Sequence, residues 1–312
     1  VWGRLQGRLA GVHVNMAERL SLLRKSVIVV MCRALGVPVV LHLHAAQLHH
    51  FYRALPAPLR ALTRWVFSLP ASVVVLGTSA RCFVTEELHV PAHRVEIVIN
   101  GVPAPVERRR QSGPDGTQRI LFLGNLSERK GISDLLQALA RPGFAASRLQ
   151  VILAGGGDVP AYRSKARALG IDNVVRFEGW CDQGQVAQLL ATSDLLVLPS
   201  YDEGLPLVIL EALAHGVAVV CTPVGEIPSV LTHGVNAYFI APGDVEGLAT
   251  GLQEVLRDPE LLETLGRNGR ALFEQRFSLP QFFASIARIH QRHFGIASQP
   301  VQAGTLAREP AR

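Results

Sequence analysis

The chain has 312 residues, 48% of them hydrophobic, which is ample for one large or two ordinary domains. No uninterrupted apolar run approaches the roughly 18 residues of a membrane span. The start, Val1 to Arg4, also lacks the apolar core of a signal peptide, so we expect a cytoplasmic protein. The four cysteines show no metal or redox spacing, and we expect free thiols.

The net charge of +6 is unevenly distributed along the chain. Residues 1–113 carry 14 Lys and Arg against 5 Asp and Glu, whereas residues 114–312 carry 17 against 20. A basic first part suits an anionic partner such as a membrane surface or a phosphorylated lipid acceptor. A basic surface that is merely solvated is an equally good interpretation of the charge alone.

The first hundred residues alternate between short apolar runs and longer amphipathic segments, which predicts strands and helices in turn. Strands are predicted at 11–16, 37–44, 71–76 and 95–99, and helices at 17–35, 59–68 and 80–88.

Four histidines lie in the second predicted strand or shortly after it: His42, His44, His49 and His50. A metal site is disfavoured, because no pair has the i, i+4 spacing of a helical ligand pair and no acidic residue is near. His44 is predicted at the carboxyl end of its strand, where α/β proteins place ligand contacts. The alternative is a loop histidine that bonds to the backbone.

After a stretch rich in proline, glycine and arginine, the alternation of strands and helices resumes, which predicts parallel α/β sheets. Strands are predicted at 120–123, 151–154, 174–180, 195–198, 217–221 and 237–240, and helices at 132–140, 205–214, 245–257, 260–273 and 281–294. Ser133 and Asp134 are expected to help start the first of these helices.

The most informative stretch is Ser193 to Gly216, in which a buried strand, a polar loop and a helix follow one another. Such a unit directs free backbone N–H groups out of the start of the helix, where they suit a phosphate. Glu203 in the loop and Glu211 in the helix lie eight positions apart. A carboxylate inside the helix suits hydroxyl groups of a ribose or a sugar, which donate hydrogen bonds to an anion.

This stretch, E-G-L-P-L-V-I-L-E-A at 203–212, resembles the E-x7-E signature of retaining glycosyltransferases of family 4. Three further motifs of that family precede it in the right order: N-G-V at 100–102, G-N-L-S-E-R-K-G at 124–131, and D-L-L-V-L-P-S at 194–200. The resemblance implies the α/β fold called GT-B, with two Rossmann-like parallel-sheet domains facing a cleft. The N-terminal domain is expected to be incomplete, because nothing before His13 supplies the family's first strand and glycine-rich loop. Such truncation would leave apolar surface uncovered.

The resemblance also implies a division of the chain. The predicted parts are a truncated, acceptor-side first domain at 1–107, a linker at 108–118, a nucleotide-sugar-binding domain at 119–278, a C-terminal helix at 279–295 that crosses back to the first domain, and a disordered tail at 296–312.

Site roles follow from the resemblance residue by residue. Glu203 and His44 are the expected catalytic residues, as contacts of the transferred sugar, and no metal is expected. Asn125 stands where the family has an arginine, and Arg129 is either its substitute or, as we favour, a surface charge. The expected donor-binding residues are Gly124, Asn125, Arg129, Lys130, Gly204, Leu205, Pro206, Leu207 and Glu211.

The function implied is transfer of a sugar from a nucleotide-diphosphate sugar to a hydroxyl acceptor, with retention of configuration and no cofactor. The expected acceptor is a glycan or a lipid-linked glycan in bacterial polysaccharide or glycolipid assembly, at the inner face of the plasma membrane. No nucleic-acid partner is expected. The alternatives are a nucleotide-sugar 2-epimerase and an inactive or truncated GT-B protein that only binds nucleotide. A nicotinamide dehydrogenase is disfavoured, because Pro160 stands where its glycine fingerprint needs a third glycine.

Two single residues carry further expectations. Trp180, beside a predicted strand, is expected to pack in the core rather than to stack on a base. Glu226 replaces the second of two glycines usual in the family, and its side chain is expected either to narrow the sugar pocket or to alter which donor fits.

Overall fold

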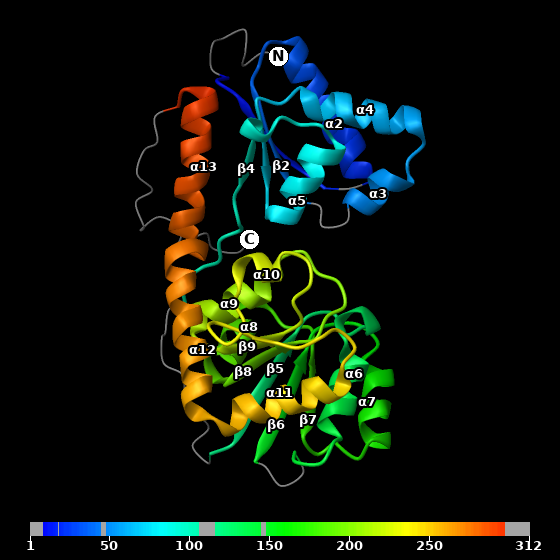
Figure 1. The fold of residues 1–312 in the computed structure, drawn as a ribbon, viewed down its shortest axis with the longest axis vertical. Helices are drawn as coiled ribbons and strands as arrows, with labels where there is room; N and C mark the ends of the chain where they lie inside the picture. The colour runs from blue at the N-terminus through cyan, green and yellow to red at the C-terminus, as the bar shows by residue number, and fades with distance from the viewer. Residues whose placement is uncertain (1–8, 18, 45–47, 106–115, 145–147, 297–312) are drawn as a thin grey trace, which may run out of the picture. The chain divides into compact units, whose positions relative to one another are not determined.

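The structure is a computed structural model that describes residues 9–17, 19–44, 48–105, 116–144 and 148–296 (Figure 1). It divides into unit 1, Val1–Asn100 with Leu279–Arg312, and unit 2, Gly101–Ser278. Both units are α/β with a parallel sheet, which confirms the predicted fold class. Most of the predicted linker and nearly all of the predicted tail lie outside the described residues.

The sheet of unit 1 has four parallel strands in chain order. They are β1 (Val12–Met16), β2 (Val39–Leu43), β3 (Ser72–Val75) and β4 (Val95–Ile97). The described helices are α2 (Leu20–Ala34), α3 (Leu48–Ala54), α4 (Ala57–Ser68), α5 (Thr78–Cys82) with the π-helical turn η1 (Phe83–Glu87), the 3-10 turn η2 (Ala92–Arg94), and α13 (Leu279–Phe294).

Both faces of this sheet are covered, because successive strand residues point to opposite sides. Val39 and Leu41 pack in a core with the inner sides of α2 and α4. Val40 and Val74, on the other face, pack against Ile289 of α13. The uninterrupted apolar runs of these strands follow from this double coverage.

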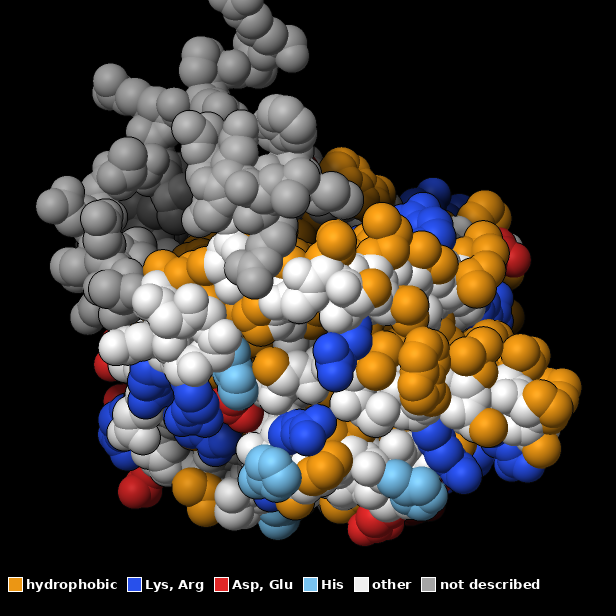
Figure 2. Space-filling model, turned by 90° about the horizontal axis from the view of Figure 1, so that it is seen from above, with side chains coloured by type: hydrophobic (Ala, Val, Ile, Leu, Met, Phe, Trp, Pro, Cys, Tyr) orange, Lys and Arg blue, Asp and Glu red, His pale blue; other side chains and the backbone are white. Residues whose placement is uncertain are grey.

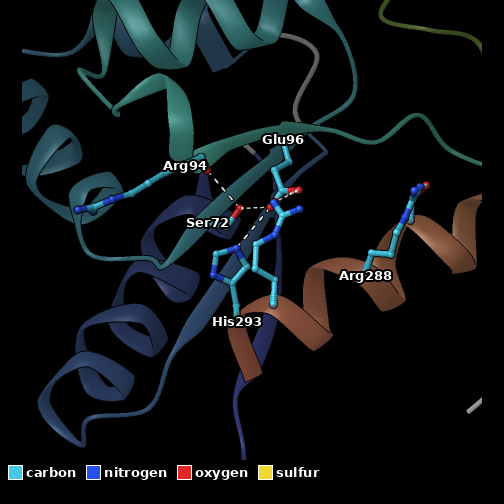
Figure 3. Close-up of polar contacts among 7 residues, drawn as sticks. Ser72, Arg94, Glu96, Arg288 and His293 are labelled. Carbon is cyan, nitrogen blue, oxygen red and sulfur yellow. Dashed lines mark hydrogen bonds and ion pairs between the residues drawn. The ribbon is translucent and has the colours of Figure 1, made fainter. Parts of the chain in front are cut away.

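Glu96 of β4 holds α13 to the edge of the sheet through polar contacts (Figure 3). Its carboxylate accepts a hydrogen bond from Ser72 Oγ (3.3 Å) and pairs with Arg292 Nη1 (3.2 Å) and His293 Nε2 (3.4 Å) of α13.

A histidine cluster links β1, β2 and α13. His13 Nδ1 lies 2.7 Å from His290 Nε2, and His13 Nε2 lies 3.3 Å from His42 Nδ1. His42 Nε2 is buried without a hydrogen-bond partner. Burial and the neighbouring histidines lower the pKa of His13 to about 4 and that of His42 to about 3.

We predict that acid destabilises unit 1 through this cluster. Between pH 6.5 and about 4, these two histidines bind protons in the unfolded chain but stay neutral in the native state. Their contribution to the free energy of unfolding is therefore full above pH 6.5 and is lost as the pH falls. The free energy of unfolding should fall by up to about 1.4 kcal/mol per pH unit for each of the two histidines. Urea unfolding at pH 7.5, 6.5 and 5.5, followed by the emission of Trp65 in a variant with Trp2→Phe and Trp180→Phe, measures it. His42→Gln should reduce the slope, and a flat profile would contradict the prediction.

Unit 2 has a six-stranded parallel sheet in the order β10-β9-β8-β5-β6-β7. The strands are β5 (Gln118–Leu123), β6 (Leu149–Ala154), β7 (Val175–Gly179), β8 (Leu195–Leu198), β9 (Ala218–Cys221) and β10 (Tyr238–Phe239). The described helices are α6 (Ile132–Leu139), α7 (Val159–Ala168), α8 (Gln183–Thr192), α9 (Leu207–His215), α10 (Ile227–Val230), α11 (Val245–Arg257) and α12 (Pro259–Leu272), with the short helical turns η3 (Glu128–Lys130) and η4 (Phe273–Phe277).

The strand order reverses at β5. The chain runs from β5 outward to β6 and β7, then returns to β8 on the other side of β5 and continues to β9 and β10. In open α/β sheets a crevice forms outside the carboxyl ends of the strands at such a switch point. The loops after β5 and β8 flank it.

Three local predictions were wrong. Helix α9 begins at Leu207, with Pro206 as the residue before it, rather than at 205. Neither Ser133 nor Asp134 caps α6; Ser133 Oγ donates instead to Glu128, and Asp134 accepts from Tyr201. Helices α7 and α8 were not predicted.

Trp180 also departs from the expectation, because its side chain is 78% exposed. It follows β7, an edge strand, at Gly179, whose φ of +75° turns the chain away from the sheet. Among the described helices none combines the length and apolarity needed to cross a bilayer.

Candidate functional site

The loops after β5 and β8 are joined across the switch point by backbone contacts. The N–H of Tyr201 donates to the carbonyl of Arg129 (2.9 Å), and Nη1 of Arg129 donates to the carbonyl of Asp202 (2.7 Å). A Cβ at Gly131 would lie 2.1 Å from the carbonyl oxygen of Pro199, so only glycine allows this approach. Arg129 is therefore exposed yet tied to the β8 loop.

Lys130 and Glu203 form an ion pair between these two loops. Their side chains are only 14% and 7% exposed, so each charge depends on the other. The two residues lie 73 positions apart in the sequence, and the sequence analysis assigned both to the donor site. The structure brings them into direct contact. An ammonium group held here can meet an anionic ligand at the carboxyl edge of the sheet.

The loop after β6 supports the loop after β5. The N–H of Gly124 donates to Ala154 O (2.9 Å), and that of Leu126 donates to Gly156 O (2.7 Å). Asn125, between them, has an exposed side chain. The glycine run that failed as a dinucleotide fingerprint thus has a structural role, since it lets two loops lie backbone to backbone.

The loop after β9 fixes the backbone next to Glu203. A Cβ at Gly225 would lie 2.0 Å from the carbonyl oxygen of Glu203. The N–H of Glu226 donates to the carbonyl of Gly204 (3.0 Å). Four loops, after β5, β6, β8 and β9, therefore converge on one edge of the sheet.

Helix α9 begins at Leu207, directly after Gly204, Leu205 and Pro206. The first N–H groups of any helix lack intrahelical partners and carry the positive end of its dipole. This helix start belongs to the loop that holds the Lys130–Glu203 pair, so it adds positive potential beside the ammonium group.

Glu211, in the middle of α9, is half-buried. Burial raises the pKa of its carboxyl group above the ordinary value. A carboxylate kept partly away from water is suited to accept hydrogen bonds from hydroxyl groups.

We predict that Glu211 lowers stability at neutral pH. Because the folded pKa is raised, the contribution of this group to stability is full below the unfolded pKa and is lost as the pH rises through the folded pKa. Glu211→Gln should therefore be more stable than the wild type at pH 7, and the difference should shrink at pH 3.5. Paired urea titrations at both pH values test this; an equal or lower stability of the variant at pH 7 would contradict it.

Two residues at this edge escaped the sequence analysis as site residues. Ser200, just after β8, is fully buried, and its hydroxyl has no hydrogen-bond partner. Glu226 was expected to narrow the sugar pocket or to alter which donor fits. It is 6% exposed, and its carboxylate accepts a hydrogen bond from Ser229 Oγ of α10 (3.3 Å). Their position after β8 and β9, at the carboxyl edge, was the available signal.

His44 belongs to unit 1, whereas the other candidates belong to unit 2. It follows β2 directly, and its N–H donates to Met16 O (2.8 Å). Its ring centroid lies 4.1 Å from that of His42, and burial lowers its pKa. In the described part of the chain no group of three or more His, Cys, Asp or Glu residues is placed to hold a metal ion.

A family model for glycosyl transferases group 1 matches residues 105–272, more than half of the chain. The chain belongs to this family. The match spans the loops after β5, β6, β8 and β9, and it confirms the resemblance that the motifs indicated.

Relatives and solved structures agree with this membership. Glycogen synthase of Mycobacterium tuberculosis is 27% identical over 263 residues, which are 81% of this chain and 63% of the relative. N-acetyl-alpha-D-glucosaminyl L-malate synthase of Bacillus anthracis is 32% identical over 61% of this chain and 52% of its own length. The chain thus spans between half and two thirds of these relatives.

Two solved structures share the fold. Sucrose-phosphate synthase of Thermosynechococcus elongatus has a TM-score of 0.77 at 20% identity, covering 94% of this chain and 76% of its own. Anabaena Alr3699/HepE, solved in complex with UDP, has a TM-score of 0.74 at 21% identity, covering 89% and 78%. The two parallel-sheet units therefore have the GT-B fold of group 1 glycosyltransferases.

Proposed function

We propose that this protein is a retaining glycosyltransferase that moves a sugar from a nucleotide-diphosphate sugar to an acceptor hydroxyl. One observation carries the proposal: the loops after β5 and β8 bring Lys130 and Glu203 together at the switch point, next to the start of α9. Family membership supplies the reaction class.

In this proposal the diphosphate of the donor lies against Lys130 and the backbone N–H groups at Gly204, Leu205 and Leu207, with Pro206 setting the turn before α9. Departure of the diphosphate develops negative charge, and fixed positive groups stabilise that change most strongly. Gly124 and Asn125 form the floor beside the phosphates, and Arg129 adds a cation at the rim. No metal ion takes part.

Glu211 accepts hydrogen bonds from the ribose hydroxyls, and Glu203 contacts hydroxyls of the transferred sugar. The Lys130–Glu203 pair holds both side chains in place before the donor arrives, which lowers the entropic cost of binding. His44 keeps the role that the resemblance implies, a contact of the transferred sugar. The departing phosphate assists the incoming hydroxyl, so no protein nucleophile is needed.

The nature of the substrates is also part of the proposal. HepE was solved with UDP and with UDP-glucose, and TarM of S. aureus with UDP and α-GlcNAc-glycerol. A lipopolysaccharide core biosynthesis glycosyltransferase of Rhizobium meliloti is 32% identical over 55% of this chain. We therefore propose a UDP-sugar donor and a glycan or lipid-linked acceptor, in bacterial polysaccharide or glycolipid assembly at the cytoplasmic face of the membrane.

The test incubates the chain with a panel of nucleotide sugars in EDTA, with and without glycan acceptors, and follows release of the nucleoside diphosphate. NMR of the product assigns its anomeric configuration. Release that yields the donor's own anomer supports the proposal. An inverted anomer removes the retaining mechanism, and an epimerised sugar without acceptor identifies an epimerase. Binding of nucleotide without any turnover would contradict the enzymatic proposal for this chain.

A further inference from the structure

Helix α2 carries a second apolar stripe, away from the sheet. Leu20, Leu23, Val27 and Met31 recur at intervals of three or four residues, and they are 76%, 66%, 54% and 53% exposed. The inner side of the same helix is formed by buried residues of the unit 1 core: Leu22, Val29 and Cys32. Helix α2 is therefore apolar on two sides, and within the described residues only the inner side is packed against the core.

Helix α4 continues this apolar surface. Leu59, Leu62 and Trp65 are about half exposed and recur every three residues, and α4 packs beside α2. We call these residues the α2/α4 face: Leu20, Leu23, Val27, Met31, Leu59, Leu62 and Trp65. In Figure 2 many hydrophobic side chains (orange) lie on the surface of the molecule, with Lys and Arg side chains (blue) between them. Seven large apolar side chains exposed on two neighbouring helices are more than the singly scattered ones of an ordinary protein surface, which suggests an interaction site.

The charge around this face is predominantly positive, although Glu87, whose carbonyl accepts from Arg64 of α4, lies beside it. From Arg19 to Thr85 the chain has eight Lys and Arg and not one Asp or Glu. Arg24 and Lys25 lie on α2, within one turn of Leu20 and Leu23, and Arg60 lies on α4. Five of these eight cations lie on the two helices that carry the exposed apolar residues: Arg24, Lys25, Arg33, Arg60 and Arg64.

We propose that the α2/α4 face docks on a lipid bilayer that contains anionic lipids. A bilayer of this kind suits both the apolar side chains and the cations of the face. The apolar side chains enter the boundary between headgroups and acyl chains, and the cations remain at the anionic headgroups. A tryptophan at the edge of the face, such as Trp65, is typical of this boundary. This inference does not depend on transferase activity.

The charge argues against other occupants. A second copy of the chain would bring two surfaces of net positive charge together. A protein segment packed over α2 would take the guanidinium of Arg24 out of water, which costs free energy unless that segment brings an acidic partner. A nucleic acid would pair its phosphates with the cations, but its polar sugar-phosphate backbone would then contact the exposed leucines and Met31.

The experiment is sedimentation of the chain with vesicles of phosphatidylcholine, alone or with 30% phosphatidylglycerol (about a third anionic lipid, to set a strong surface potential). We expect binding to the anionic vesicles only, weakened by salt. Arg24→Gln with Arg60→Gln should lower the partition coefficient about fivefold per charge. Leu20→Ser with Leu23→Ser should abolish binding. The matched control, Trp180→Ser with Val235→Ser, alters exposed apolar residues of unit 2 and should bind as the wild type does.

Two further measurements distinguish a bilayer from a second copy of the chain as the partner of the α2/α4 face. In a variant with Trp2→Phe and Trp180→Phe, Trp65 is the remaining tryptophan of three, and its emission should shift to the blue with anionic vesicles. Light scattering of the chain without lipid gives its oligomeric state. The proposal is overturned if the chain does not sediment with anionic vesicles at low salt, if the Leu20 and Leu23 variant binds like the wild type, or if these leucines instead hold a dimer together. If a natural form carries residues before Val1, loss of vesicle binding in that form would assign the face to those residues and overturn it too.

Discussion

Lys130→Met should destabilise unit 2 by about 3 kcal/mol and lower sugar transfer about 10²- to 10³-fold. The stability loss follows because Glu203, 7% exposed, would keep its charge without its partner. The loss of transfer follows because the ammonium is the proposed fixed charge that stabilises the departing diphosphate. Urea unfolding measures the first effect, and initial rates with saturating donor measure the second.

A double variant separates the two roles of Lys130. Lys130→Met with Glu203→Gln removes both charges, so the stability should return to within about 1 kcal/mol of the wild type, since replacing both partners leaves no buried orphan. Transfer should stay as low as in the single variant. If the single variant kept wild-type stability, the buried pair would have no energetic role; if the double variant recovered transfer, Lys130 would not bind the diphosphate.

Gly225→Ala should strongly damage the loops of the site. The φ of Gly225 is +60°, which costs a non-glycine residue about 1–2 kcal/mol. The new Cβ would also lie 2.0 Å from the carbonyl oxygen of Glu203, so the backbone that carries Glu203 and Gly204 must move. We expect a total loss of about 2–5 kcal/mol together with loss of nucleotide binding.

Gly170→Ala is the matched control for this substitution. Its φ is +70°, and a Cβ there would meet no atom within 4 Å. It should therefore show only the conformational cost, about 1–2 kcal/mol, with nucleotide binding unchanged. Equal effects of the two substitutions, measured by urea unfolding and nucleotide titration, would mean that the close approach of the loops after β8 and β9 does not matter.

The strands were the part of the fold that the sequence predicted best. β8 was predicted at the residues where it lies, and β5, β6 and β9 within two residues. These strands are buried on both faces, so their apolar runs are uninterrupted and end where polar loops begin. Helices α7 and α8 were missed although each starts at an aspartate cap, Asp158 or Asp182, because few of their side chains are buried: Tyr162 and Ala166 in α7 and Leu190 in α8.

The chemistry of the candidate site was predictable only as a set of residue types. Motif order placed Lys130, Glu203 and Glu211 near one edge of a sheet, but the pairing of Lys130 with Glu203 depends on strand order, which the sequence does not state. Trp180 shows the opposite failure. An aromatic residue beside a strand was expected to be buried, and the left-handed backbone of Gly179 at an edge strand leaves it exposed.

The central claim is that unit 2 binds a nucleoside diphosphate at the edge formed by the loops after β5 and β8. Isothermal titration of the chain with UDP, GDP and ADP tests it directly, with Glu211→Gln as the variant and Glu263→Gln, an exposed glutamate of α12, as the control. We predict one site that favours UDP, weakened at least about tenfold by Glu211→Gln and unchanged by Glu263→Gln. Absence of binding for all three nucleotides, or equal binding to both variants, would contradict the account.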